Sequence, residues 1–480
     1  MLRFSSPFVF ILLTLTLPAQ TIEVKLSPVM GMLNLLETLQ GATGTSVTLR
    51  KQAEQQLPDE VRATLLNDYQ QLRTEYQFIR EGYPSARKVI LSTRKLLMLA
   101  AAQATDLTDF QTRITGILPN QDMISLIDIL GRLEPYYQKL FWNPNHESLA
   151  SLQKQMTEEI PDILPLFKKA KTFYGTPWPA SLPFIVNLYP IPALEGHTAA
   201  TPYGNVLVCG YLTRHPQALE QLKGIVIHEM CHILYEEQTQ AMQNDLDDWF
   251  KKDDSPFRPF AYSYLDEGLA TAIGNGWGEE ILNGKLDTGQ WYDDPYIDTY
   301  AKSLYPEVKS YLDHHRTIDQ SFVVKAVAAF AKSFPDALFS FENLLNEVNI
   351  YTEEEDPVRI QQIITTIRTS FTVRNSWVSS PIASDQSLER MKNGPATHLI
   401  LVDRNHQAIL SKINQNIESL RTVLNGLRIS GETIITHVDA DTGNTYIICI
   451  LFNEESLPRA MEALQAAKNL DLNQSVIPIK

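Results

Sequence analysis

The string His228-Glu229-Met230-Cys231-His232 lies inside a segment, residues 221–243, whose apolar pattern is that of one continuous helix. Residues four apart on an α-helix lie on one face, so His228 and His232 can offer their imidazoles to the same metal ion. Glu229 is rotated around the helix away from the line of the two histidines and lies beside the metal. The spacing therefore predicts two metal ligands and, at Glu229, a group that accepts a proton from water.

The predicted helix is apolar on nearly every side. The residues that make it so are Ile225, Val226, Ile227, Ile233 and Leu234. Such a helix is buried, and buried polar groups without partners cost about 2–7 kcal/mol. A metal would supply those partners. The alternative is a chance pair of histidines on an amphipathic helix.

A catalytic zinc normally has three protein ligands, so a third must come from elsewhere in the chain. Residues 264–270 read Tyr-Leu-Asp-Glu-Gly-Leu-Ala and offer two carboxylates, Asp266 and Glu267. Taken alone, Glu267 could be an ordinary first-turn glutamate favoured by the helix dipole. Small residues in the same segment would let a second helix approach the first closely. They are Gly268, Ala270, Ala272 and Gly274.

With these two strings the chain resembles the gluzincin class of zinc metallopeptidases, in which a glutamate on a second helix follows the His-Glu-x-x-His helix. The resemblance implies a zincin-like fold and a Zn²⁺ cofactor held by His228, His232 and Glu267. It also implies that Glu229 is the general base, and later the acid, in the hydrolysis of peptide bonds. It covers the two ligand helices and the strands before them. The metzincin string is excluded, because neither its glycine nor its third histidine follows His232.

The chain departs from closer subfamilies of that class. Thermolysin-like enzymes often carry an aspartate four residues after the ligand glutamate, where this chain has Thr271. The Gly-x-Met-Glu-Asn string of animal-type aminopeptidases is absent, and residues 193–197 resemble it only weakly. The groups that orient the ligands are therefore left open.

Residues 183–189 and 205–209 are short β-rich runs bounded by turn residues. In the resembling enzymes an edge strand binds the peptide substrate as an added strand, and we expect Tyr203–Cys209 to be that strand. The alternative is that these runs are plain core strands.

A donor to the developing oxyanion, usually a tyrosine or histidine, completes such a site. The amphipathic segment 294–313 is rich in tyrosine and is followed by two histidines. From these we select Tyr305 and His315 as further catalytic residues. The alternative is that both are core or surface residues.

The first residues resemble a secretory signal peptide, residues 1–20. Arg3 precedes an apolar run, Phe8–Leu17, and Pro18-Ala19-Gln20 follows with expected cleavage near Ala19. An apolar run of this length is about half of what a bilayer span requires. We therefore expect a secreted or periplasmic protein whose mature chain has no stable membrane span.

Charge and cysteine content exclude other classes. The formal net charge of -15 disfavours nucleic acid and anionic membranes as partners. With three cysteines, Cys209, Cys231 and Cys449, at least one thiol stays free and disulfides do not organise the fold. Cys231 points away from both histidines and is expected to be a buried packing residue.

Along the chain the patterns predict an α+β protein. A helical N-terminal domain spans 21–165. A mainly helical zincin-like metallopeptidase domain with a small antiparallel-type sheet spans 166–375, and a polar linker spans 376–395. Residues 396–480 follow the order β-α-β-β-α, which predicts a small ferredoxin-like module. This module could bind a protein partner, dock substrate or cap the enzyme.

Two other interpretations stay open. In the first, the chain is a catalytically inactive zincin-like exported protein that binds a partner or substrate through its accessory domains. In the second, the metal is purely structural, which would require a fourth protein ligand. The presence of Glu229 favours an enzyme, because that residue is needed for chemistry and not for metal binding.

Overall fold

The computed structural model describes residues 20–479 except 43, 85, 86, 88, 89, 216, 217, 428 and 454. The predicted signal peptide, apart from Gln20, lies outside these residues. The chain divides into two compact units. Unit 1 contains the residues up to Asp247 together with Asp266–Asp319. Unit 2 contains Asp248–Leu265 and the residues from Gln320 onward.

Unit 1 is built on a four-stranded sheet in the order β1-β4-β6-β5. Its strands are β1 (Ile22–Leu26), β4 (Phe184–Ile191), β5 (Ala200–Tyr203) and β6 (Val206–Leu212). β1, β4 and β6 are parallel, and only the edge strand β5 is antiparallel to its neighbour. The predicted antiparallel-type sheet is therefore wrong. β4 is buried at every position, as expected of a parallel strand covered on both faces.

Helices and a short hairpin make up the rest of unit 1. They are α1 (Pro28–Gln40), α2 (Val47–Gln56), α3 (Asp59–Gln70), the hairpin β2 (Gln77–Ile79) and β3 (Ile90–Ser92), α4 (Thr93–Gln103), α5 (Leu107–Ile114), α6 (Asn120–Tyr137), the π-helix η2 (Gln138–Trp142), α7 (Asn143–Tyr174), α8 (Ala218–Glu236), α9 (Gln240–Lys252, whose last residues belong to unit 2), α11 (Leu265–Thr271, from its second residue), the π-helix η3 (Ala272–Gly278), α12 (Glu279–Asn283) and α13 (Pro295–Asp313).

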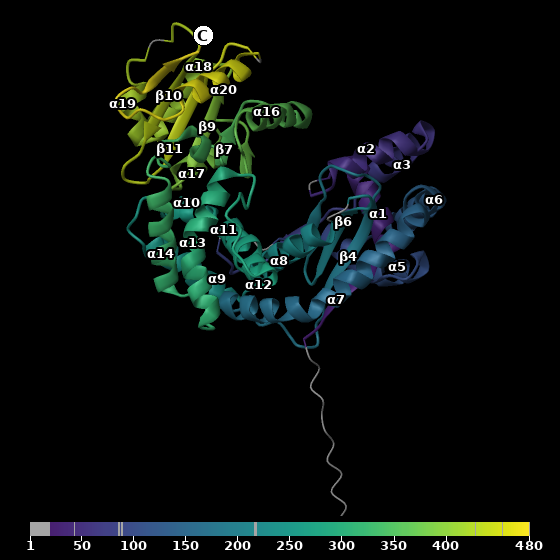
Figure 1. The fold of residues 1–480 in the computed structure, drawn as a ribbon. Coiled ribbons are helices and arrows are strands. Elements are labelled where there is room, and N and C mark those ends of the chain that lie inside the picture. Colours follow the sequence, from purple (N-terminus) through teal and green to yellow (C-terminus); the bar gives the residue numbers. More distant parts are fainter. Residues whose placement is uncertain are drawn as a thin grey trace, which may run out of the picture. The chain divides into compact units, whose positions relative to one another are not determined.

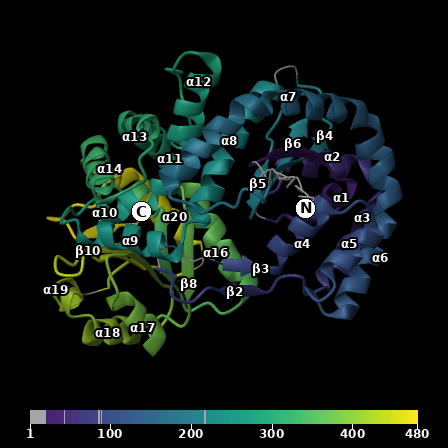
Figure 2. The same ribbon diagram turned by 90° about the horizontal axis from the view of Figure 1, so that it is seen from below.

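The alternation of side chains along β4 assigns these helices to two layers. Phe184 packs against Phe167 of α7, with ring centroids 5.8 Å apart. Asn187 faces the other way, and its Nδ2 donates to the carbonyl of Ala102 at the end of α4 (2.8 Å). α7 and α8 pack together on one side, and α1 and α4 on the other. Figures 1 and 2 show the sheet between these helices.

The predicted boundary between a helical domain and a metallopeptidase domain, at residue 165, is not found. α7 runs without a break from Asn143 to Tyr174. In addition, β1 pairs with β4, Ile22 opposite Phe184, so the N-terminal segment is part of the sheet that supports α8. The sequence pattern of β1 is too short to indicate a partner so distant in the chain.

Unit 2 contains a six-stranded sheet in the order β12-β10-β11-β9-β7-β8. Its strands are β7 (Glu347–Tyr351), β8 (Asn375–Ser379), β9 (Thr397–Val402), β10 (Thr433–Val438), β11 (Thr445–Ile450) and β12 (Val476–Pro478). The two consecutive strands in the predicted order β-α-β-β-α are the antiparallel pair β10–β11. β11, β9, β7 and β8 are parallel to one another.

The helices of unit 2 cover both faces of this sheet. They are α10 (Arg258–Ser263), α14 (Gln320–Ser333), α15 (Phe341–Leu344), α16 (Pro357–Ser370), α17 (Asp385–Lys392), α18 (His406–Asn416), the 3₁₀ turn η4 (Glu418–Leu420), α19 (Arg421–Leu424) and α20 (Ser456–Ala467). One apolar core includes Ile367 of α16 and Leu464 of α20. The other includes Met391 of α17 and Ile413 of α18. Helices on two faces make three layers, so the predicted ferredoxin-like module, with its helices on one face, is wrong.

The predicted linker, residues 376–395, is also folded. It supplies most of β8, which pairs with β7, and all of α17, whose Leu388 and Met391 are buried. The linker follows the single turn α15 and the strand β7 in the chain. Polar and proline-rich composition suggested a linker, but pairing with a strand distant in sequence determines the structure.

Within the part of the chain that the structure describes, no helix has the length and apolar character to cross a membrane. Cys209, Cys231 and Cys449 are all buried and unpaired. The predicted free thiol and the predicted burial of Cys231 are confirmed.

Candidate metal centre

α8 presents the two histidines one helical turn apart. The Nε2 atoms of His228 and His232 are 3.1 Å from each other. The helix around them is anchored by side chains with no exposed surface, among them Val226, Ile233 and Leu234. The apolar pattern that predicted a buried helix is therefore confirmed, and it fixes the direction in which both imidazoles point.

α11 brings Glu267 to the same point. Its Oε2 lies 3.6 Å from Nε2 of His228 and 3.5 Å from Nε2 of His232. η3, which continues α11, packs directly on α8. A Cβ at Gly274 of η3 would lie 2.8 Å from the Cα of His228, closer than real structures allow. The predicted close approach of the two helices is confirmed, and it requires glycine at this position.

The three converging atoms form a triangle with sides of 3.1, 3.5 and 3.6 Å. Ligand atoms about 2.0–2.2 Å from a tetrahedral zinc are about 3.3–3.6 Å from each other. Glu267 Oε2 is buried and has no hydrogen-bond partner within the described residues. The predicted set of His228, His232 and Glu267 is thus brought together, and it could hold a metal ion.

Asp266 orients His232. Its Oδ1 lies 2.9 Å from the Nδ1 of that imidazole, which donates its N–H to the carboxylate. The Nε2 lone pair is then left facing Glu267. Carboxylate partners of this kind fix the tautomer and orientation of a metal-binding histidine. Asp266, the rival of Glu267 as third ligand in the sequence, has this supporting position instead.

Asn275 has the corresponding position for His228. Its Oδ1 lies 3.3 Å from the His228 Nδ1, and its Nδ2 donates to the carbonyl of Trp291 (3.1 Å). The second bond fixes the amide so that its oxygen faces the imidazole. The position where a thermolysin-like enzyme often has aspartate, Thr271, is fully buried and its hydroxyl has no such contact.

The charges of the ligand group are coupled. Burial alone would raise the pKa of the Glu267 carboxyl, but the neighbouring imidazoles of His228 and His232 hold it well below its usual range. Burial would lower the pKa of the His232 imidazole, but Asp266 and Glu267 raise it well above its usual range. Without a metal, the negative charges of the two acids and the positive charge of a protonated histidine compensate each other. A divalent cation would replace the proton on the imidazole.

Glu229 lies on the same helix and does not belong to the ligand triangle. Burial raises the pKa of its carboxyl, an effect that His232 and His228 partly oppose. A carboxyl whose pKa is shifted toward neutrality can accept a proton and return it near pH 7. This environment is consistent with the predicted role of Glu229 as a general base.

The two other predicted catalytic residues, Tyr305 and His315, have contacts or conformations of another kind. The hydroxyl of Tyr305 donates to Glu280 of α12, and its ring packs edge-on against Trp291. His315 is exposed on the turn after α13, with a positive φ of 52°. These contacts explain both residues by packing or by backbone conformation, and they give no support to a role at the metal.

Tyr292 is the tyrosine whose ring contacts a ligand. It stacks on the imidazole of His228, with ring centroids 5.9 Å apart and an angle of 23° between the planes. Asp298 holds the backbone here by accepting from the N–H groups of Trp291 (2.7 Å) and Tyr292 (3.3 Å). No sequence pattern selects Tyr292, because it precedes the periodic segment that begins at Asp294.

The edge strand beside α8 is β5 and not the predicted Tyr203–Cys209. Most of that predicted segment belongs to β6, which is hydrogen-bonded on both sides, to β4 and β5. β5 is short and contains Pro202. Proline lacks a backbone donor and is tolerated at sheet edges. Within the described part of the chain, the edge beside α8 that no other strand pairs with is therefore that of Ala200–Tyr203.

Comparison of the chain with protein-family models, with curated proteins and with solved structures gives no match.

Proposed function

We propose that this protein is an exported zinc metallopeptidase of the gluzincin type. The observation that carries the proposal is the triangle of His228, His232 and Glu267 with the half-buried Glu229 on the same helix. The donor set of two imidazoles and one carboxylate is that of a catalytic zinc site with an open fourth position. A purely structural zinc would require a fourth protein ligand, and the described group offers three.

Zinc bound by these residues would polarise the scissile carbonyl and bring the pKa of water there to about 7. Glu229 then accepts the proton of the attacking water and delivers it to the leaving amine. Asp266 and Asn275 hold the two imidazoles in the orientation that leaves their Nε2 atoms inward. β5 offers its free edge to the substrate backbone.

Tyr292 is the residue that we propose as donor to the developing oxyanion. Its ring lies against His228, and Asp298 fixes the adjoining backbone. A hydrogen bond made only in the transition state raises the rate of the chemical step. This assignment replaces Tyr305 and His315.

The principal experiment compares wild type with Glu229→Gln in zinc content and in hydrolysis of a peptide library. We expect about one zinc per chain in both proteins and a loss of turnover of about 10²–10⁴-fold in the variant. Glu237→Gln, an exposed glutamate just beyond the end of α8, is the matched control and should keep full activity. A fully active Glu229→Gln, or wild type that neither binds zinc nor cleaves any peptide, would overturn the proposal.

Tyr292→Phe tests the oxyanion donor separately. We expect kcat to fall about 100-fold with zinc content unchanged, because one hydrogen bond to the transition state is lost. Tyr305→Phe, which removes a hydroxyl from Glu280, should change kcat much less. If Tyr305→Phe is the more damaging substitution, the assignment of Tyr292 is wrong.

A further inference from the structure

A cleft with a volume of about 870 Å³ lies beside the metal ligands within unit 1. Ile225 of α8 and Asn275 of η3 form its wall nearest to the ligands. Asn275 also contacts His228, so the cleft and the metal centre share a residue. Its volume is near the upper end of the roughly 300–1,000 Å³ typical of ligand sites. The cleft is large enough for much more than one side chain.

The cleft extends away from the ligands along α8. Its lining on this helix continues from Ile225 through Gly224 to Glu220. At about 1.5 Å per residue, Glu220 and His228 are about 12 Å apart along the helix axis. An extended peptide advances about 3.3 Å per residue, so this length corresponds to three or four residues.

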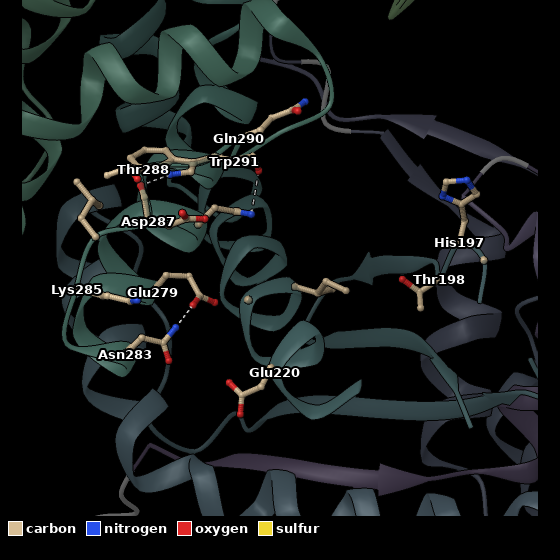
Figure 3. Close-up of a pocket in the computed structure, with 15 residues that line it drawn as sticks. His197, Thr198, Glu220, Glu279, Asn283, Lys285, Asp287, Thr288, Gln290 and Trp291 are labelled. Carbon is tan, nitrogen blue, oxygen red and sulfur yellow. Dashed lines mark hydrogen bonds between the residues drawn. The ribbon is translucent and has the colours of Figure 1, made fainter. Parts of the chain in front are cut away.

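The two walls of the cleft come from separate segments. Figure 3 shows His197 and Thr198 on one side, and Glu279 and Lys285 on the other. The backbone of His197 is fixed at the start of α2, because its N–H donates to Thr48 and its carbonyl accepts from Ser46, both at 2.8 Å. β5 begins two residues after Thr198, so a strand added to β5 is continuous with the cleft.

The lining is more acidic than basic. Its carboxylates belong to Glu220, Glu279 and Asp287, and Lys285 is its one lysine or arginine among the described residues. Glu279 approaches α8 closely, since a Cβ at Gly224 would lie 2.9 Å from its Oε1. The apolar surface of Trp291 and Ile225 lies in the same cleft and suits the methylene stem of a long basic side chain.

We infer that this cleft binds an extended segment of three or four substrate residues on one side of the scissile bond, and favours lysine or arginine there. The inference rests on the proposed peptidase function and specifies its substrate class. The protein then acts on polypeptide segments and not on dipeptides, because the remote residues supply binding energy for catalysis.

Peptide length is the first test. On the full-length zinc-loaded protein, kcat/KM is measured for peptides extended one residue at a time on each side of the scissile bond. We expect kcat/KM to rise at least about tenfold over three or four residues on one side only. Thr198→Trp, which fills the cleft, should abolish this rise. Leu194→Trp, in the same segment but 56% exposed and outside the cleft, should retain it.

Charge is the second test. Replacing a lysine of the substrate segment by glutamine should lower kcat/KM about fivefold or more in wild type, and much less in Glu279→Gln. Glu280→Gln is the matched control, because this neighbour contacts Tyr305 and Lys309 and does not line the cleft. Equal preference in both variants and wild type would contradict the role of Glu279.

The outcomes separate the two proposals. Zinc-dependent cleavage that ignores peptide length on both sides, or that Thr198→Trp and Leu194→Trp affect equally, overturns the cleft inference and leaves the peptidase intact. Absence of any zinc-dependent cleavage in a library of long peptides overturns the proposed function itself.

Discussion

Two histidine environments, one in each unit, have opposite electrostatics. In unit 1, Asp266 and Glu267 raise the pKa of His232 well above its usual range. In unit 2, His398 of β9 is fully buried, and burial lowers the pKa of its imidazole to about 4. The hydroxyl of Tyr351 lies 3.0 Å from its Nδ1, and its ring stacks on Tyr446. Neither neighbour carries a carboxylate.

The comparison shows that burial and carboxylates act in opposite directions on an imidazole. Burial alone keeps the ring neutral, since it penalises the charged form. Two acids beside the ring favour a positive charge, which a proton or a metal ion can supply. Of the two histidines compared, His232 is the candidate ligand, because carboxylates lie beside its ring.

The largest expected effect is loss of the metal itself. Glu267→Ala removes one of the three ligands and the only negative one, so we expect zinc affinity to fall by several orders of magnitude. Elemental analysis after dialysis would show about one zinc per chain in wild type and almost none in the variant. Glu280→Ala, an acidic residue outside the triangle, is the control and should keep its zinc. A variant Glu267→Ala that retains zinc would show that the triangle is not the binding site.

The next effect concerns His398 and the stability of unit 2. Its folded pKa of about 4 lies below the unfolded value of 6.5, so the unfolded state binds more protons between these values. The stabilisation is complete above pH 6.5 and is lost as the pH falls toward 4. We expect a loss of about 2 kcal/mol between pH 7 and pH 5 and about 3 kcal/mol in total.

Hydrogen exchange of β9 and β11, corrected for the intrinsic effect of pH, measures this change. His398→Gln should reduce the pH dependence of protection in these strands. His406→Gln, a partly exposed histidine of α18, serves as the control and should leave it unchanged. Equal pH dependence in wild type and His398→Gln would show that His398 is not the responsible group.

The smallest effect tests the support of a ligand. Asp266→Asn keeps the shape of the side chain but removes the charge beside His232, so we expect zinc affinity to fall about 10–100-fold. Competition with a chelator of known affinity measures this fall. Asp298→Asn, which acts on the backbone of Tyr292, should change zinc affinity much less. An unchanged affinity in Asp266→Asn would mean that the carboxylate does not tune the ligand.

The pair His228 and His232 could be predicted from the sequence because helical geometry places residues four apart on one face. Glu267 was implied by the resemblance to the gluzincin class. Small residues indicated the approach of the second helix, and Gly274 shows why. The partner of His228 could not be found in the same way. Asn275 lies in a π-helical turn. The α-helical periodicity, which predicts the residues that share a face, does not apply there.

The errors in the fold have a common cause. β1 pairs with β4, and β8 with β7, through contacts between segments far apart in the chain. Local periodicity identifies an apolar run but not the strand with which it pairs. It therefore does not predict β1 as a strand of the sheet, and it makes the segment of β8 and α17 resemble a linker. Similarly, the sequence pattern favours β6 as the edge strand in place of β5, because the apolar pattern of β6 is stronger than that of the short β5.

The parallel pairing of β1 with β4 has a consequence during synthesis. At about 5–20 residues per second, the ribosome needs roughly 10–30 s to make the chain between these two strands. Until then β1 has an unpaired edge, and the sheet beneath α8 is incomplete. The ligand residues follow β4 and β6 in the chain. The sheet that carries the candidate metal centre is therefore complete only after its first strand has paired with β4.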